Sequence, residues 1–145
     1  MKALIQRVKR ASVTIDGKLY SSISSGLLVF VGVEKADEKG NAEKLAQKVV
    51  NLRIFEDEND KMNYSVLDKQ GEILVVSQFT LCGDCKKGTR PSFDKSAPLD
   101  KAIDLYEYFV KCIKESGLNV ETGKFRAMMD VELINDGPVT FYIEK

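Results

Sequence analysis

Apolar and polar residues alternate in places over the first part of the chain, from Ala3 to Ile15. Alternation with a period of two is typical of a strand with one buried face. Asp16-Gly17 follows directly, and this pair is strongly preferred in two-residue hairpin turns. We therefore expect a β-hairpin made of residues 3–15 and residues 18–23.

Two later segments are apolar without alternation. Residues 27–33 read Leu-Leu-Val-Phe-Val-Gly-Val, and residues 73–76 read Ile-Leu-Val-Val. A strand that is apolar on both faces is expected at the centre of a sheet covered on both sides. We expect residues 27–33 to be such a strand. The second apolar run belongs to a strand of residues 72–81 that becomes polar towards its end.

Two stretches show the three- and four-residue spacing of amphipathic helices. For the first helix we expect Asp37 as the N-cap and a buried stripe of Ala42, Leu45, Ala46, Val49 and Val50. The second should begin at a cap of Ser96 or Asp100 and run to about Ser116, with Gly117 as its stop. Its expected buried stripe is Leu99, Ile103, Tyr106, Phe109, Val110 and Ile113.

Three short strands are expected after the second helix, over residues 118–121, 129–134 and 139–143. Asn135-Asp136-Gly137-Pro138 consists of turn formers and should separate the last two. We interpret the acidic residues 57–60 as a solvated turn. The resulting order is two strands, two strand–helix units and three strands, and a length of 145 residues fits one domain. The sequence therefore predicts a single layered α/β domain over residues 1–145.

The charge and composition of the chain limit the functions that it can have. The 22 basic and 22 acidic residues balance, so no global field attracts nucleic acid, and any RNA contact must be local. No long apolar stretch predicts a membrane span, and the N-terminus lacks the features of a signal peptide. We expect a cytoplasmic protein.

Histidine is absent from the chain, and only three cysteines are present. Without histidine, one chain cannot build a Ser-His-Asp or Cys-His site or a histidine-ligated zinc site. Cys82 and Cys85 have the spacing of a redox pair or of half a zinc site. A tetrahedral zinc would still need Cys112 or carboxylates from elsewhere. A thiol or metal module is therefore the main alternative to the enzyme described below, for which we expect no metal or cofactor.

Ser77-Gln78-Phe79-Thr80-Leu81 brings two hydroxyls and an amide to the end of a buried strand. In an extended segment Gln78 and Thr80 share one face. Thr80 can orient a nucleophile while backbone N–H groups stabilise an oxyanion, and this needs no titratable side chain. The structural alternative is a strand edge with satisfied hydroxyls.

Asn135 to Thr140 is either a plain reverse turn or a functional segment. Glycine before Pro138 leaves the backbone approachable, so carbonyl groups there can accept hydrogen bonds from an ammonium group. The long segment of residues 82–98 is expected to be functional. Its basic residues Lys86, Lys87 and Arg90 either contact phosphates or form a solvated face.

Together these motifs resemble the D-aminoacyl-tRNA deacylase family. Ser77 to Leu81 matches its SQFTL motif, and Asn135 to Thr140 matches its N-x-G-P-x-T motif. The resemblance extends over nearly the whole chain, through residues 1–8, 51–57, 87–88 and 90–93. It implies a three-layer sheet/sheet/helix fold and a homodimer whose active sites are built from both chains.

The resemblance also implies an activity, the hydrolysis of the ester of D-aminoacyl-tRNA, and a role for each motif. Ser77, Gln78, Phe79 and Thr80 would surround the ester. A cis Gly137-Pro138 segment of the partner, within the motif of Asn135, Val139 and Thr140, would hold the amino group and reject L side chains. Glycine mischarged on tRNA would be accepted because it has no side chain to reject. By position, Arg7 would brace the Gly-Pro segment and Met129 would line the pocket.

The chain departs from the family pattern in two places. Cys82-Gly83-Asp84-Cys85 stands where the family commonly has an aromatic-Ala-Asp-Thr-like stretch, and Phe125-Arg126-Ala127 stands where a Phe-Gly-Ala-like stretch is common. Arg126 either adds a phosphate contact or narrows the approach to adenosine. A noncatalytic dimeric RNA-binding protein with the same fold is the third possible function.

Overall fold

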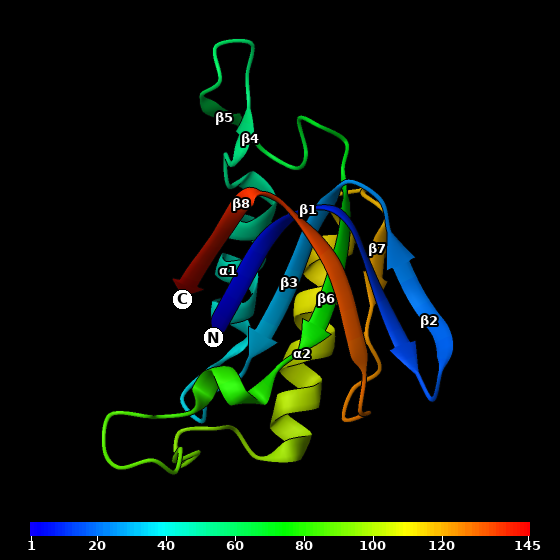
Figure 1. Cartoon of the computed structure of the whole chain (residues 1–145). Coiled ribbons are helices and arrows are strands. Elements are labelled where there is room, and N and C mark those ends of the chain that lie inside the picture. The colour runs from blue at the N-terminus through cyan, green and yellow to red at the C-terminus, as the bar shows by residue number, and fades with distance from the viewer.

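The computed structural model describes all of residues 1–145, and Figure 1 shows its arrangement. The strands are β1 (Lys2–Ile15), β2 (Lys18–Ile23), β3 (Gly26–Gly32), β4 (Phe55–Glu56), β5 (Met62–Tyr64), β6 (Glu72–Ser77), β7 (Val120–Thr122) and β8 (Asp130–Glu144). The helices are α1 (Lys39–Asn51), the 3-10 helix η1 (Phe79–Cys82) and α2 (Leu99–Lys114). The short hairpin of β4 and β5, which flanks the acidic turn, was not expected from the sequence.

Strand β3 lies at the centre of the sheet, as expected. It pairs antiparallel with β1 and parallel with β6, and β6 pairs parallel with β7. Leu27, Leu28 and Val29 have no exposed surface. The prediction of a central strand covered on both faces is therefore confirmed, as is the β1–β2 hairpin.

The sheet curls because β1 pairs with three strands. Residues 2–8 of β1 pair with β3, residues 11–15 pair with β2, and β8 runs along both parts. At the far end Ser21 Oγ of β2 donates to the carbonyl of Thr122 in β7, at 2.9 Å. The two ends of the sheet thus approach each other around a small core of seven buried residues, Val8, Ala11, Val13, Ile23, Leu28, Leu74 and Val76.

Both long helices cover the other face of the sheet (Figure 1), over a larger core of 23 buried residues. Helix, sheet and folded-over sheet make three layers, which confirms the expected fold. Neither long helix combines the length and the apolar composition that a membrane span requires.

Helix α1 buries the expected stripe, but its expected cap is wrong. The residue before the helix is Glu38, whose backbone N–H donates to Asn41 Oδ1 at 2.9 Å. Asp37 instead accepts a hydrogen bond from the Met1 ammonium at 2.5 Å and another from the Glu34 N–H at 2.6 Å. The carboxylate is drawn away from the helix because a buried cation lies beside it.

Helix α2 begins after Pro98, and neither Ser96 nor Asp100 caps it. Tyr106, Phe109, Val110 and Ile113 are buried as expected, together with Leu105. Leu99 is wrong as a core residue, since 46% of it is exposed, and Ile103 is only partly buried. Of the apolar residues in the first turn of α2, only Ala102 packs against the core, and it is partly buried.

The expected break between the last two strands is also wrong. Strand β8 continues through Asn135 to Pro138, but its register against β1 shifts. Gln6 is opposite Thr140 and Val8 is opposite Asn135, so residues 136–139 all lie opposite Arg7. The turn formers therefore make a bulge within one strand, because β1 offers a continuous partner on both sides of them.

Replacing Asp37 with Asn should destabilise the protein by about 3–5 kcal/mol, because it leaves the buried Met1 ammonium without its anion. The Asp37 side chain is only 8% exposed and that of the ammonium residue 0%. Urea unfolding followed by circular dichroism measures the change. Asp104→Asn, at an exposed position of α2, is the control. Equal midpoints for the two variants would contradict the importance of the pair.

Candidate active site

The chain turns sharply where β6 ends at Ser77. The Gln78 N–H still donates to the Val31 carbonyl at 2.7 Å, but the Leu81 N–H already donates to the Gln78 carbonyl at 3.2 Å. Residues 79–82 therefore form the 3-10 helix η1, and the expectation of an extended segment here is wrong. Gln78 and Thr80 nevertheless meet, because the Gln78 Nε2 donates to the Thr80 Oγ1.

Gly32 lets η1 approach the end of β3. A Cβ atom at this position would lie 3.0 Å from Cys82 Sγ, 3.1 Å from Leu81 Cβ and 3.2 Å from the Gln78 carbonyl. A side chain at position 32 would therefore press against the turn. Because of this close contact, the turn that carries Gln78 and Thr80 lies directly against the end of β3.

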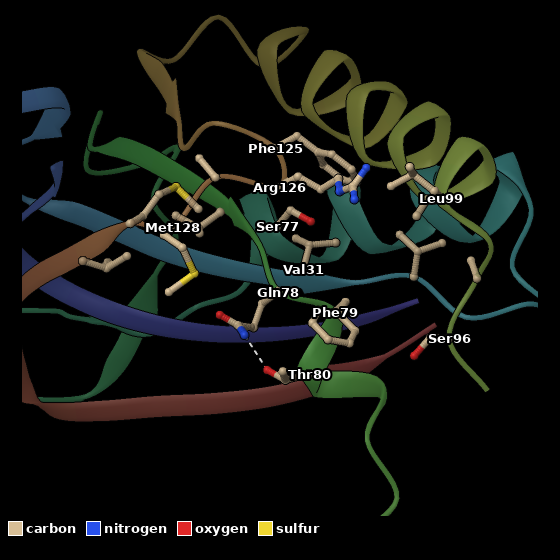
Figure 2. Close-up of a pocket in the computed structure, with 17 residues that line it drawn as sticks. Val31, Ser77, Gln78, Phe79, Thr80, Ser96, Leu99, Phe125, Arg126 and Met128 are labelled. Atoms are coloured by element: carbon tan, nitrogen blue, oxygen red, sulfur yellow. Dashed lines mark hydrogen bonds between the residues drawn. The ribbon is translucent and has the colours of Figure 1, made fainter. Parts of the chain in front are cut away.

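A pocket of about 700 Å³ opens beside this turn (Figure 2). Twelve of its 17 lining residues are hydrophobic. The expected site residues Ser77, Gln78, Phe79, Thr80 and Met129 all line it. The structure thus brings together in one pocket two segments separated by about 50 residues in the sequence. The other lining residues are Val31, Val33, Val76, Ser96, Ala97, Leu99, Ala102, Phe125, Arg126, Ala127, Met128 and Val131.

Backbone N–H groups at the start of η1 are the hydrogen-bond donors that this pocket can offer to a ligand. The first N–H groups of a 3-10 helix have no acceptor inside the helix. Phe79 and Thr80 are the first two residues of η1, and the first bond of the turn starts only at the Leu81 N–H. The arrangement can therefore offer N–H groups and the Thr80 hydroxyl to a ligand oxygen.

Aromatic rings border the pocket. Phe79 is 59% exposed, and its ring packs against Phe93, with 4.8 Å between the centroids. On the opposite wall Phe125 packs against Tyr106 at 5.6 Å. The Tyr106 hydroxyl donates to the Val75 carbonyl at 3.0 Å, and burial raises the pKa of this hydroxyl. Tyr106 thus anchors the wall through its packing and its hydrogen bond.

Met129 reaches the pocket across Gly123. A Cβ atom at Gly123 would lie 2.9 Å from the Met129 Sδ, so only the absence of a side chain there leaves room for the thioether. The Gly123 N–H donates to the Val75 carbonyl at 2.9 Å, which holds the segment beside β6.

Arg7 is buried to 4% exposure and contacts the bulge of β8. Its Nε donates to the Asp136 carbonyl at 2.9 Å, and its Nη1 donates to the Ile54 carbonyl at 2.7 Å. The next peptide bond, Gly137–Pro138, is cis, and both residues are exposed. The φ of Gly137 is 143°, in a region that favours glycine. Arg7 therefore holds the backbone directly before the Gly-Pro pair.

Asn135 closes the bulge from inside. Its Oδ1 accepts the Val139 N–H at 2.6 Å, while its Nδ2 donates to the Val139 carbonyl at 3.2 Å and to Thr140 Oγ1 at 3.1 Å. Val139 is buried and Thr140 is exposed. All residues of the expected N-x-G-P-x-T motif thus lie in one locked segment.

A single chain keeps this segment away from the pocket. Arg7, opposite the bulge, pairs with Leu27 near the start of β3, whereas Ser77 pairs with Val31 near its end. Gly137, Pro138 and Arg7 are therefore not among the residues that line the pocket. Any joint action of the two motifs requires a second chain.

The basic residues lie in the segment between η1 and α2. Lys86, Lys87 and Arg90 are exposed, and a two-way backbone pairing of Asp84 with Ser92 closes the base of this loop at 2.7 and 3.0 Å. Lys86 and Lys87 share a small polar depression with Asp84 and Asp94, apart from the apolar pocket. Two carboxylates thus lie among the cations of this loop.

The cysteine pair is divided between interior and surface. Cys82 is 1% exposed, and its thiol donates a hydrogen bond to the Val33 carbonyl at 3.4 Å. Burial raises the pKa of the Cys82 thiol, so its reactive thiolate form is disfavoured. Cys85 is exposed, and Cys112 lies on α2. Cys82 is the last residue of η1, and its burial there is a sufficient structural reason for a cysteine at this position.

Comparison with known proteins adds a decisive observation. A protein-family model described as D-Tyr-tRNA(Tyr) deacylase matches residues 4–144 of the chain. The chain belongs to this family. A D-aminoacyl-tRNA deacylase of Geotalea daltonii is 59% identical over 144 residues, with 99% of this chain and 96% of the relative covered. One of Thermotoga petrophila is 58% identical, with 99% and 97% covered. The prediction of a hydrolase of the deacylase family is therefore confirmed.

Two solved structures share the fold of this deacylase family member. A protein described as c-Myc DNA Unwinding Element Binding Protein is 43% identical, with a TM-score of 0.94 over 100% of this chain and 99% of its own. A probable eukaryotic D-amino acid tRNA deacylase is 16% identical, with a TM-score of 0.82 over 98% of both chains. The second similarity concerns the fold alone.

Several lining residues were not expected from the sequence. Ser96, Leu99, Phe125 and Met128 all contribute to the pocket. The sequence instead predicts Leu99 as a core residue and Ser96 as a helix cap. Met128 is 92% exposed, which is unusual for an apolar side chain, but its neighbours in the sequence give no sign of this.

Alkylation of the native protein should modify Cys85 and spare Cys82, because Cys82 is buried and its pKa is raised. Iodoacetamide treatment at pH 8 followed by peptide mass spectrometry measures the labelling of each thiol. Treatment in urea, where both should react, is the control. Rapid labelling of Cys82 in the folded state would favour a reactive-thiol function after all.

Proposed function

We propose that this deacylase family member hydrolyses the ester that joins a D-amino acid to the 3′ end of tRNA. The observation that carries the proposal is that Ser77, Gln78, Phe79 and Thr80 line one 700 Å³ pocket at the start of η1. This pocket offers backbone N–H groups and a hydroxyl to a carbonyl compound, as ester hydrolysis requires.

In the proposed reaction the ester carbonyl oxygen lies against the amides of Phe79 and Thr80. These amides stabilise the negative charge that develops when the carbonyl carbon is attacked. Water is the nucleophile, and the 2′-hydroxyl of the terminal adenosine assists by positioning it. The bond to the ribose 3′-oxygen breaks, this oxygen takes up the proton, and free amino acid and tRNA leave.

Thr80 orients groups in this reaction and forms no covalent intermediate. Its Oγ1 accepts the hydrogen bond from Gln78, so its own proton remains free to donate. No carboxylate, lysine or α-amine lines the pocket, so no general base there can activate a threonine as a nucleophile. The substrate hydroxyl takes over the positioning of the water.

The proposed selectivity comes from a second copy of the chain. The bulge at Gly137 and Pro138 is exposed, held by Asn135 and Arg7, and distant from its own pocket. In a homodimer the partner's bulge would enter the pocket, where its carbonyl groups accept hydrogen bonds from the substrate ammonium. Rigid backbone beside the chiral carbon then excludes an L side chain but not glycine.

The same proposal gives the basic loop a role. Lys86, Lys87 and Arg90 would contact tRNA phosphates near the acceptor end, which places the site on the RNA without reading its sequence. A cytoplasmic location follows from this substrate. The 43% identical protein named for DNA binding keeps noncatalytic nucleic-acid binding as the second candidate function.

The purified chain should release D-tyrosine from D-Tyr-tRNA and glycine from Gly-tRNA, and should leave L-Tyr-tRNA intact. Deacylation of tRNA carrying radiolabelled amino acid measures the three rates. A binder without catalysis would release none of them. Equal rates for D-Tyr-tRNA and L-Tyr-tRNA would show hydrolysis without the proposed selectivity.

Thr80→Val in the same assay should lower kcat on D-Tyr-tRNA by about 10²-fold with little change in KM, the size expected when one oriented group of the reaction is lost. Ser22→Ala, which removes an exposed hydroxyl of β2 that does not line the pocket, should have no effect. Trapping of an acyl-Thr80 species by acid quench and mass spectrometry would replace the proposed route by a covalent one.

Asn135→Ala should lower the ratio of kcat/KM for D-Tyr-tRNA over L-Tyr-tRNA by about tenfold. The variant loses the hydrogen bonds that lock the bulge, each worth about 1 kcal/mol. Asn119→Ala removes an exposed amide elsewhere in the chain and serves as the control. An unchanged ratio would mean that the locked bulge does not select the substrate.

A mixed dimer identifies which chain supplies the bulge. One protomer carries Thr80→Val and its partner carries Asn135→Ala, with different purification tags. The Asn135→Ala protomer then has the only active pocket, and the Thr80→Val protomer has the only intact bulge. If the bulge acts on the partner's pocket, these two meet, and the mixed dimer keeps native selectivity at half the native activity. If the bulge acts within its own chain, selectivity falls as in the Asn135→Ala protein.

A further inference from the structure

Arg126 is the only ionisable side chain among the 17 residues that line the pocket. It is exposed and takes part in none of the ion pairs of the structure. Its guanidinium therefore stands without a protein anion on the wall of a largely apolar pocket. Guanidinium groups at such places bind carboxylate or phosphate with paired hydrogen bonds.

The backbone at Arg126 points to a role of its side chain. Its φ is 64°, in the left-handed region where a glycine is favoured. The turn itself is closed by the Ala127 N–H, which donates to the Lys124 carbonyl at 3.2 Å and needs no side chain. Backbone strain of this kind is concentrated at functional sites. The arginine thus occupies this position against the preference of the turn.

The place of Arg126 in the pocket suggests which anion it meets. Figure 2 draws it on the same wall as Phe125 and Leu99, across the pocket from Gln78 and Thr80. In the proposed reaction the ester lies at Gln78 and Thr80, and the nucleoside that carries it extends into the apolar part of the pocket. The nearest anion along the substrate is then the 5′-phosphate of that nucleoside.

We propose that Arg126 binds the 5′-phosphate of the nucleotide whose ester is hydrolysed, and so makes the pocket select a nucleotide over a nucleoside. The orientation of the ligand rests on the proposed function. The contact itself can be tested without any hydrolysis, because adenosine 5′-monophosphate and adenosine differ only in the group that Arg126 is to bind.

Isothermal titration calorimetry of the native protein should give a dissociation constant for adenosine 5′-monophosphate that is about fivefold lower than that for adenosine. A difference of this size is expected for one exposed ionic contact. Arg126→Gly should abolish this difference, and Arg126→Lys should keep part of it because the charge remains. Lys124→Gln removes a cation of the same turn that does not line the pocket, so this variant should keep the full difference. High salt should reduce the preference of the native protein.

Four results would overturn the assignment. The first two are equal binding of both ligands by the native protein and binding of neither. The third is binding of inorganic phosphate as tight as that of the nucleotide. The fourth is stronger binding of both ligands, to the same extent, by Arg126→Gly, which would show that the arginine only narrows the pocket. Failure to hydrolyse D-Tyr-tRNA would disprove the proposed function while leaving the nucleotide preference as a separate result.

Discussion

Strand β1 pairs with three other strands, and the rest of the architecture depends on this pairing. Its 14 residues give one edge to β3 and then to β2, while β8 follows the other edge over nearly the whole length. A strand so long must twist, and its two halves then face different layers. The sheet consequently closes over a second core, and β2 reaches β7. The segment after β7 is thereby placed over the end of β6, where it forms one wall of the pocket.

The second constraint is the buried guanidinium of Arg7. A charge with 4% exposure needs polar partners on every side, and Arg7 finds them in the Asp136 and Ile54 carbonyls and in Glu56. These partners belong to the bulge of β8 and to residues 54–56, which follow α1 and include β4. Two parts of the chain that lie far apart in the sequence are thus tied to one side chain of β1. The exposed Gly137 and Pro138 stand on this rigid base and not on a free loop.

Much of this was predictable from local sequence patterns. The β1–β2 hairpin, the central strand, the buried stripe of α1 and most of that of α2 follow from periodicity over a few residues. Two of the wrong predictions share one cause, a partner far away in the sequence. Asp37 is taken from its helix by an ammonium 36 residues away, and the turn formers around Gly137 become a bulge because β1 pairs on both sides of them.

The candidate site shows the same division. The Ser77 to Leu81 motif could be recognised in the sequence, whereas its 3-10 helix and the close approach of that helix to Gly32 could not. That Met129 reaches the same pocket depends on the missing side chain of Gly123, in a segment whose pattern predicts nothing of the kind. Periodicity reports which face of an element is buried, but not which elements leave room for one another. The pocket is formed where elements leave room for one another, so its shape could not be predicted from the sequence.

The pocket and the bulge illustrate how a chain without histidine can carry out ester hydrolysis under the proposed function. Backbone groups have a fixed charge distribution, and they need no proton to be gained or lost before they act. They must, however, be held rigidly, because a hydrogen-bond donor loses most of its effect when it moves by an ångström. Here η1 is pressed onto β3 at Gly32, and the bulge is locked by Asn135 and Arg7. The groups of η1 and of the bulge are thus held against two paired strands of the main sheet, β3 and β1.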